Sequence, residues 1–369
     1  MKILILSCNT GEGHHSAAKA IAEAAEKRGI EWELANPIAF KNERARKIVD
    51  TSYNNMIKKT PKLFGAVYRL GTMYDRTSLT SPVYYTTSLC AKPLNDYIRA
   101  KGFDAVICTH LFGMEAMTAI RRRKMNDIPV YGVMTDYTSI PFFGETELDG
   151  YIIPHGELAA ETADKGVPAD KIYPFGIPVA GKFSNRIGRD AARELLKVPK
   201  DRRVYLIMSG GVGCGGISDL CDELIRADDG EYLACVMAGK NEKMTEQLSK
   251  RFANEPCIRI VPFTKEVNVY MEAADVVISK PGGLSSTEAA VSGIPIVHLM
   301  TIPGCETKNA EFFRSHGMSV LAEDIKDAAE KAKRFTFDSD AADEMRRCQA
   351  ANTNPRAADD ILDLVMKNE

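Results

Sequence analysis

Residues 279–290, with the sequence SKPGGLSSTEAA, are the stretch that decides the fold. They follow the apolar run 274–278, which predicts a buried parallel strand, and they open a short helical pattern that ends at Gly293, a typical C-cap. Two glycines, followed by three hydroxyl residues, belong to this junction. Glycine lets an anion approach the backbone, and the free N–H groups and dipole of a helix N-terminus attract it.

Two interpretations of this stretch stay open on the residues alone. Glu288 lies one turn into the predicted helix, where its carboxylate would accept two hydrogen bonds from a ribose diol. The first interpretation is therefore a nucleotide diphosphate site whose ribose is bound by Glu288. The second is a plain strand–turn–helix junction in which a hydroxyl residue caps the helix and Glu288 completes a capping box.

The composition indicates a soluble globular chain long enough for two domains. It has 369 residues, 45% hydrophobic and 27% charged, and its net charge of −2 gives no overall attraction to nucleic acid or acidic membranes. Nine cysteines without Cys-x-x-Cys pairs or zinc spacing favour reduced thiols in a cytoplasm. The apolar residues 1–6 are too few for a signal peptide, and no run is long enough for a transmembrane helix.

The first half of the sequence predicts a parallel sheet built from strand–helix–strand units. Residues 8–15 form the expected loop between the first strand and a helix at 16–27 that ends at Gly29. Residues 176–179 form an exit turn and domain link. The expected strands are 2–7, 31–35, 105–108, 130–134, 150–153 and 172–175.

Four titratable residues follow strands of this predicted sheet: His14, His110, Asp136 and His155. Ligands of open α/β sheets bind at the carboxyl ends of the strands, so we expect these side chains to gather at one edge. His14 shares its helix stripe with the apolar residues that face the sheet, which makes it the functional candidate, whereas His15 faces water. Each residue alone also has an ordinary explanation in capping or core packing.

Residues 41–95 interrupt the alternation of strands and helices. Between residues 41 and 69, eight basic residues stand against two acidic ones, interleaved with aromatic and aliphatic side chains. A basic, aromatic insertion in a nearly neutral protein suits the surface of an anionic membrane. The alternative is a set of helices that cover the sheet, because such helices also have apolar faces and lysine-rich outer sides.

The second half predicts another parallel sheet. A glycine loop after its first strand formally fits the Gly-x-Gly-x-x-Gly dinucleotide fingerprint at residues 211–216. The next strand leads to Lys240, where an acid would be needed for a ribose, so a general phosphate-binding or close-packing loop is favoured. The expected strands are 203–208, 232–237, 258–261, 274–278, 294–299 and 319–321.

The tail is predicted to be helical over residues 341–366, with a break near Pro355. Just before it, Asp338-Ser339-Asp340 resembles a metal-binding pair of aspartates, but a helix N-cap explains it better. No other cluster has convincing metal spacing. The Gly-x-x-x-x-Gly-Lys-Ser/Thr motif is absent from the sequence, which excludes a P-loop ATPase or kinase.

Taken together, four motifs resemble glycosyltransferase family 28: GEGH at 11–14, VMTD at 133–136, GIPV at 176–179, and 279–290 with GIP at 293–295. The chain looks most like the branch that glycosylates diacylglycerol, the bacterial diglucosyl-diacylglycerol synthases and plant monogalactosyl-diacylglycerol synthases. It is more distantly similar to the lipid-linked N-acetylglucosaminyltransferase of peptidoglycan synthesis. The resemblance runs from the first strand to about Ser319.

The resemblance implies a GT-B fold: two Rossmann-like domains facing across a cleft, with a C-terminal helix crossing back. Residues 1–180 would bind the acceptor and carry the insertion 41–95, residues 181–340 would bind a UDP-sugar, and residues 341–369 would pack back toward the first domain. The implied reaction is an inverting transfer that needs no metal and no cofactor. A UDP-sugar and a membrane lipid would be the partners, with no nucleic acid.

Carried onto this chain, the resemblance implies that His14 is the candidate base, or at least an acceptor-side contact, and that Glu288 binds the ribose. Phe263 would lie by the uracil, while Glu306 and Asn309 would bind the sugar hydroxyls. On the donor side it also implies Ser209, Gly210, Gly211, Gly282, Gly283, Ser285, Ser286, Thr287, Gly304 and Cys305. On the acceptor side it implies Gly11, Gly13, His110 and Asp136.

One residue departs from the family pattern. The loop that reads the sugar usually has Pro-Gly-Gln-Glu, but here it is Pro303-Gly304-Cys305-Glu306. Glutamine offers a strong donor and a strong acceptor, and cysteine offers neither, so the sugar is less constrained than the nucleotide. Bacterial members mostly use UDP-glucose, which makes glucose the expected hexose.

The expected function is thus transfer of glucose from UDP-glucose to a lipid such as diacylglycerol, by a cytoplasmic enzyme bound peripherally at the inner face of the cell membrane. One alternative is transfer to a polyprenyl-diphosphate lipid. Another is a UDP-sugar-binding protein, or a 2-epimerase, on the same fold.

Overall fold

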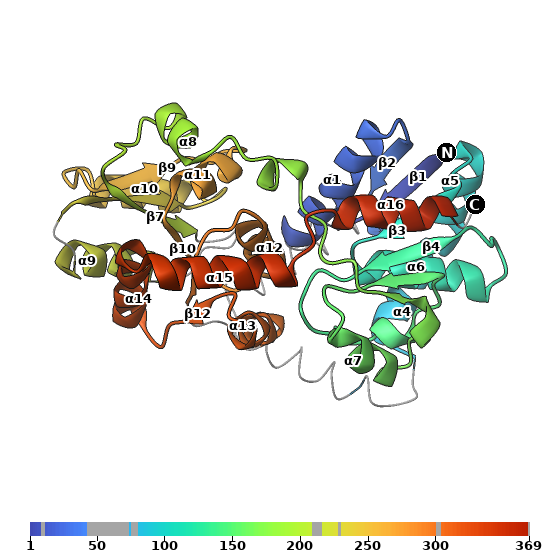
Figure 1. The fold of residues 1–369 in the computed structure, drawn as a ribbon. Helices are drawn as coiled ribbons and strands as arrows, with labels where there is room; N and C mark the ends of the chain where they lie inside the picture. The colour runs from blue at the N-terminus through green and yellow to red at the C-terminus, as the bar shows by residue number, and fades with distance from the viewer. Residues whose placement is uncertain are drawn as a thin grey trace. The chain divides into compact units, whose positions relative to one another are not determined.

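The computed structural model describes residues 1–8, 12–42, 74, 80–208, 216–227, 230–299 and 304–367. These form two compact units, Met1–Gly181 with Asn354–Glu369, and Lys182–Thr353 (Figure 1). Most of the predicted insertion and the glycine loop 209–215 lie outside the described residues, as do Gly11, Ser209, Gly210 and Gly211.

The first unit contains a six-stranded parallel sheet in the order β2-β1-β3-β4-β5-β6. Its central strands are buried on both faces, which is why they appear in the sequence as continuous apolar runs. The six predicted strands are confirmed, with ends that differ by two residues at most. The strands are β1 (Lys2–Leu6), β2 (Glu31–Ala35), β3 (Ala105–Cys108), β4 (Val130–Val133), β5 (Gly150–Ile152) and β6 (Ile172–Tyr173).

Helices cover this sheet. They are α1 (Glu12–Lys27), α4 (Pro82–Thr87), α5 (Ala91–Lys101), α6 (Leu111–Arg122), α7 (Leu158–Asp164) and α16 (Ala357–Lys367), with short 3-10 turns η1 (Pro37–Phe40), η2 (Ser88–Cys90), η3 (Phe143–Glu145), η4 (Ala169–Lys171) and η5 (Gly181–Phe183). The prediction that residues 12–15 belong to a loop is wrong, because α1 already begins at Glu12. An acid in the first turn complements the helix dipole, and this offsets the weak helix propensity of the glycine and histidines that follow.

The helix α16 returns to the first unit and packs on α1. Its buried residues Ile361, Leu362 and Val365 join the core that α1 and the sheet share. Arg28, at the end of α1, lies 2.7 Å from a carboxylate oxygen of Asp359 and 2.7 Å from one of Asp363. The two helices are therefore joined by an apolar face and by ion pairs at its edge.

The second unit repeats the plan, with a parallel sheet in the order β12-β11-β10-β7-β8-β9. All six predicted strands are confirmed here too. The strands are β7 (Arg203–Met208), β8 (Tyr232–Met237), β9 (Ile258–Val261), β10 (Val276–Ser279), β11 (Ile296–His298) and β12 (Val320–Leu321). The helices are α8 (Arg189–Leu195), α9 (Ile217–Ala227), α10 (Glu242–Arg251), α11 (Val267–Ala273), α12 (Gly283–Val291), α13 (Cys305–Ser315), α14 (Ile325–Phe337) and α15 (Ser339–Asn352).

Two predicted helix ends are confirmed in this unit. Gly293 follows α12 with φ of +63°, a left-handed conformation that favours glycine, and its N–H donates to Ala290 O at 2.9 Å. Asp338 caps α15, since its side chain accepts a hydrogen bond from the Ala341 N–H at 2.9 Å. The acidic sequence at 338–340 is therefore explained by capping.

The predicted tail divides between the two units. The helix α15 lies in the second unit, where Gln349 donates from its side-chain amide to the carbonyls of Ile294 and Met318. The helix α16 lies in the first unit. Among the described residues, no helix combines the length and the apolar character needed to cross a membrane.

Candidate functional site

Each sheet has one place where the strand order reverses. In the first sheet the chain leaves β1 for β2 on one side and returns to β3 on the other, and in the second it leaves β7 for β8 and returns to β10. Loops that part at such a point leave a crevice at the carboxyl ends of the strands, where ligands of open α/β sheets bind. His14 and His110 follow β1 and β3, and the stretch 280–288 follows β10.

His14 lies in the first turn of α1, beside the end of β3. Its Nδ1 is 2.8 Å from the carbonyl oxygen of Thr109 and 2.8 Å from the hydroxyl oxygen of Thr135. The Thr109 hydroxyl in turn donates to the backbone carbonyl of His14 at 3.0 Å. The imidazole is thus oriented by residues that follow two different strands, β3 and β4.

These contacts decide which nitrogen of His14 carries the proton. A carbonyl oxygen only accepts hydrogen bonds, so the contact with Thr109 requires a proton on Nδ1. A neutral imidazole has one such proton, which leaves Nε2 as the basic nitrogen. Burial lowers the pKa of His14 below its usual 6.5, against the opposing effects of Asp136 and of the Thr109 carbonyl. The ring is therefore neutral near pH 7 and can accept a proton at Nε2.

His110 stands next to His14, as predicted. Their ring centroids are 4.6 Å apart in an edge-on arrangement. The His110 Nδ1 accepts a hydrogen bond from the N–H of Phe112 at 3.1 Å, so this residue caps α6. Burial, and then the neighbouring His14, lower its pKa well below the usual value. His110 is therefore a neutral residue that caps α6 and packs against the ring of His14.

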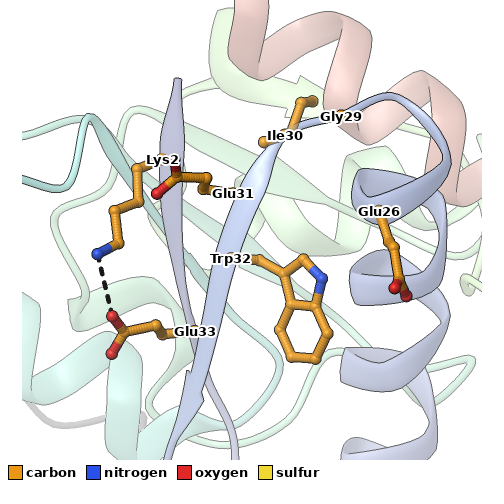
Figure 2. A pocket seen from close by; sticks show the side chains of 7 residues that line it. All are labelled: Lys2, Glu26, Gly29, Ile30, Glu31, Trp32 and Glu33. Atoms are coloured by element: carbon orange, nitrogen blue, oxygen red, sulfur yellow. Dashed lines mark ion pairs between the residues drawn. The ribbon is translucent and has the colours of Figure 1, made fainter.

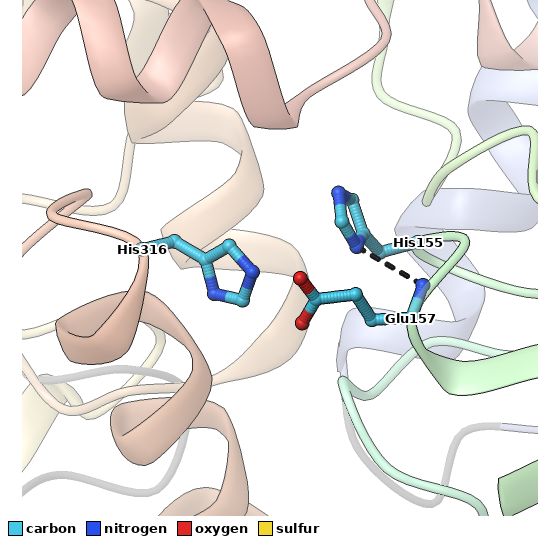
Figure 3. A group of neighbouring side chains, drawn as sticks. All are labelled: His155, Glu157 and His316. Carbon is cyan, nitrogen blue, oxygen red and sulfur yellow. Dashed lines mark hydrogen bonds between the residues drawn. The ribbon is translucent and has the colours of Figure 1, made fainter. Parts of the chain in front are cut away.

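The loop after β4 contains Asp136, which lies close enough to His14 to act on its pKa. Glu161 holds Thr138 and Ser139 of this loop in place. Its carboxylate accepts hydrogen bonds from the Ser139 N–H at 3.1 Å and from the Thr138 hydroxyl at 3.2 Å. His155 follows β5 along the same edge, where its Nδ1 accepts from the backbone N–H of Glu157 at 3.3 Å (Figure 3). Asp136 thus belongs to the environment of His14, while His155 organises its own turn.

On the side predicted to bind the UDP-sugar, Gly282 caps α12 in an extended conformation and Gly283 is the first residue of that helix. A Cβ added at Gly282 would lie 3.0 Å from the Ser285 hydroxyl oxygen, closer than most Cβ contacts. The backbone N–H groups of the first turn have no acceptor inside a helix. They are the donors that an anion would use at this place.

The hydroxyls of Ser286 and Thr287 point into the protein. Ser286 is fully buried, with its Oγ 3.0 Å from Nε2 of His298, and the Thr287 hydroxyl donates to the Gly283 carbonyl at 2.7 Å. His298, also fully buried, has its Nδ1 3.0 Å from the Ser319 hydroxyl. The hydroxyls predicted for the diphosphate therefore hold α12 in place, and only Ser285 is half-exposed.

Glu288 lies on α12 and is half-buried. Burial raises the pKa of its carboxyl to about 7, although Lys182 opposes the shift. A carboxyl that titrates near pH 7 loses some of its hydration on folding and would regain polar contacts from a bound diol. This position agrees with the ribose interpretation better than with a solvated capping-box acid.

The helix α13 starts beside this glycine turn. Gly304 precedes it with φ of +144°, and Cys305 and Glu306 form its first turn. Glu306 makes an ion pair with Lys280, and the Asn309 side-chain amide donates to the Pro281 carbonyl at 3.1 Å. Glu306 and Asn309 are thus brought to the turn before α12, as the sequence predicts for residues of one donor site.

Phe263, predicted to lie by the uracil, is 55% exposed after β9. The Lys240 ammonium lies 5.5 Å from the centre of its ring. An exposed aromatic ring at the carboxyl edge of the sheet can stack on a planar base. Lys240, which stands where the dinucleotide fingerprint requires an acid, therefore lies over this ring.

Several residues of these sites were not among the site residues predicted from the sequence. They contact or act on the predicted residues from other elements, and they are Thr109, Thr135, Lys280, His298 and Lys182. Strand-end position was the available signal, because Thr109, Thr135, Lys280 and His298 all stand within two residues of a strand end.

Two further features involve residues that were not predicted as site residues. A hollow of about 300 Å³ opens at the amino ends of β1 and β2. Lys2 pairs with Glu33 at 3.0 Å on one side of β2, and Trp32 and Glu26 lie on the side that faces α1 (Figure 2). It is at the sheet edge opposite to the carboxyl ends. In the second unit, His316 follows α13 as its C-cap, and its ring is stacked on that of Phe312.

Comparison with known families assigns both halves of the chain. Residues 14–179 match the monogalactosyldiacylglycerol (MGDG) synthase family, and residues 220–361 match the C-terminal domain of glycosyltransferase family 28. The two halves of the chain thus resemble the two domains of family 28 glycosyltransferases. The resemblance predicted from the four motifs is confirmed, and the chain is an enzyme of the glycosyltransferase class.

The chain has curated relatives along its whole length. It is 25% identical over 373 residues to the processive diacylglycerol beta-glucosyltransferase of Bacillus thuringiensis (strain Al Hakam), covering 99% of this chain and 93% of the relative. The protein of the same name from Bacillus cereus (strain AH187) is 25% identical over 372 residues, with the same coverage.

Solved structures confirm the GT-B fold of this chain, with two Rossmann-like domains. MurG of Acinetobacter baumannii has a TM-score of 0.65 at 14% identity, with 99% of each chain covered. The UDP-GlcNAc 2-epimerase of Neisseria meningitidis has a TM-score of 0.63 at 12% identity, with 100% of each chain covered.

Proposed function

We propose that this glycosyltransferase moves glucose from UDP-glucose to a membrane lipid of the diacylglycerol type, with inversion and without a metal. The observation that carries the proposal is the oriented His14, whose basic Nε2 stands at the switch point of the first sheet. The relatives named diacylglycerol beta-glucosyltransferases, which match 99% of this chain, support the lipid acceptor and the sugar.

In the proposed step, a lipid hydroxyl attacks the anomeric carbon from the face opposite UDP. The new C–O bond forms as the bond from the sugar to the diphosphate breaks, and His14 takes the hydroxyl proton at Nε2. Because UDP-glucose is an α-glycoside, a β product requires this inversion. The relatives' names specify a beta-glucosyltransferase, which agrees with a single displacement.

Negative charge grows on the leaving diphosphate during the reaction. The N–H groups in the first turn of α12 would bind this charge, and removing a preorganised donor of that kind typically costs about 100-fold or more in rate. Glu288 would hold the ribose diol, Phe263 would stack on the uracil, and Glu306 with Asn309 would bind the glucose hydroxyls.

We expect full activity to persist in EDTA, and loss of activity there would contradict the metal-free mechanism.

The enzyme would act from the cytoplasm at the inner face of the membrane. Support comes from the basic, aromatic composition of residues 41–69, which the structure leaves undescribed apart from residues 41 and 42. Binding to anionic liposomes, but not to neutral ones, is the expected result. A UDP-sugar 2-epimerase would need neither kind of liposome.

The decisive experiment combines purified protein, a panel of UDP-sugars, and diacylglycerol in anionic liposomes, with products identified by mass spectrometry. We expect glucosyl-diacylglycerol from UDP-glucose. Transfer only to polyprenyl-diphosphate lipids would show that diacylglycerol is not the acceptor. Formation of an epimerised UDP-sugar would show that the protein is a 2-epimerase. Binding of a UDP-sugar without any turnover would show that it is a UDP-sugar-binding protein.

A further inference from the structure

Lys280 and Glu306 form an ion pair between the turn before α12 and the start of α13. Lys280 is the residue between β10 and the turn Pro281-Gly282 that opens α12, and Glu306 lies in the first turn of α13. Their side chains are 25% and 22% exposed, so the pair is shielded from bulk solvent yet accessible to a ligand. The pair therefore joins the start of the proposed diphosphate site to the residue assigned to the sugar.

A second contact holds the two helix starts together. Asn309, one turn after Glu306, is fully buried and donates to the carbonyl of Pro281, the residue after Lys280. This neutral hydrogen bond does not depend on the ion pair. If the pair separates, α13 therefore remains fixed to the turn by Asn309, and the two charged side chains are free to take other partners.

Two ligand groups would compete for this pair. A diphosphate beside Gly282 and Gly283 needs positive charge, and Lys280 is the cationic side chain adjacent to those glycines in the sequence. Glucose hydroxyls need an acceptor, and a carboxylate already bound to an ammonium has fewer lone pairs to offer. The free enzyme thus neutralises Lys280 with the same carboxylate that the sugar requires.

We propose that Lys280 binds the donor diphosphate, and that this exchange releases Glu306 to accept hydrogen bonds from the donor sugar. The inference rests on the proposed UDP-sugar function and adds a binding residue and an order of events to it. Recognition of the sugar would follow only after the diphosphate has displaced Glu306 from Lys280. Free glucose would therefore bind poorly, and UDP would compete with an internal carboxylate.

The test measures the affinity for UDP by calorimetry and the turnover of UDP-glucose in four single variants. Lys280→Met should weaken UDP binding by about tenfold or more, since a charge-assisted contact is lost. Glu306→Gln should strengthen UDP binding several-fold, because Lys280 no longer has an internal competitor, yet it should lower turnover at least tenfold. The controls are Lys308→Met and Glu311→Gln, an exposed pair on the same helix at 60% and 58% exposure, and neither should alter UDP affinity.

The double variant Lys280→Met/Glu306→Gln separates competition from a general change of charge. If the two residues compete as proposed, Glu306→Gln no longer strengthens UDP binding once Lys280 is absent. A gain that persists in the double variant would overturn the inference, as would a loss of UDP affinity in Glu306→Gln. A wild-type protein that binds no UDP would instead overturn the proposed function itself.

Discussion

The Nδ1 of His14 lies 2.8 Å from the carbonyl oxygen of Thr109, so the proton of the neutral ring is fixed on the side that faces the protein. The opposite nitrogen is the one that can take a proton from a substrate. His14→Ala is therefore expected to reduce turnover by at least about 100-fold while UDP binding survives. His15→Ala, on the neighbouring residue, is the control and should remain active. Near-normal turnover in His14→Ala would remove His14 as the base.

The pH profile should depend on Asp136. Turnover needs neutral His14, so activity is lost as the pH falls through the pKa of His14, which burial places below 6.5. The Asp136 carboxylate raises that pKa, so Asp136→Asn should move the acid limb of kcat, measured at saturating UDP-glucose, to a lower pH. An acid limb that moves upward, or does not move, would show that another group sets the profile.

Glu288 should make donor affinity pH-dependent. Its carboxyl has a pKa of about 7 in the free protein, and a ribose diol donates to the ionised form. The affinity for UDP-glucose should therefore rise several-fold from pH 6 to pH 8, and Glu288→Gln should bind more weakly without this rise. We expect Glu288→Ala to weaken UDP binding by roughly 1.5–3 kcal/mol. UDP-glucose is the better probe of pH because its diphosphate does not titrate in this range, and unchanged affinity in both variants would exclude the ribose role.

His298 should matter for stability and for the donor together. Replacing it with leucine leaves the buried hydroxyls of Ser286 and Ser319 without their imidazole partner, at a cost of about 1–3 kcal/mol for each. Denaturant unfolding should show a lower free energy, and UDP affinity should fall because the first turn of α12 is less well held. His316→Leu, at the end of α13, is the control, and a His298→Leu protein of normal stability would contradict this account.

Glu115 should destabilise the protein at alkaline pH. It is fully buried, and burial followed by the nearby Glu145 raises its pKa to about 10 from 4.5. Its contribution to stability is fully present below pH 4.5 and is lost as the pH rises through about 10. Glu115→Gln should therefore unfold at a higher denaturant concentration than wild type at pH 9, and a lower midpoint would show that the carboxyl is stabilising in its ionised form.

The strands could be predicted because parallel strands buried on both faces are continuous apolar runs, and caps such as Gly293 and Asp338 have local chemical causes. Which residues collect at the sheet edges was also predictable, since it follows from strand ends. The contacts that give these residues their chemistry were not. His14 with Thr109 and Lys280 with Glu306 are joined by topology, and the inward turn of the Ser286 hydroxyl depends on a histidine that no local pattern reveals.

The place of α16 bears on how the protein is made. Ile361, Leu362 and Val365 complete the core on α1, but they are synthesised only after the entire second unit. During translation, the apolar face of α1 that α16 covers therefore stays exposed until the end of the chain has been synthesised. A chain interrupted after residue 353 would keep that face exposed permanently, and such fragments would be targets for chaperones and proteases.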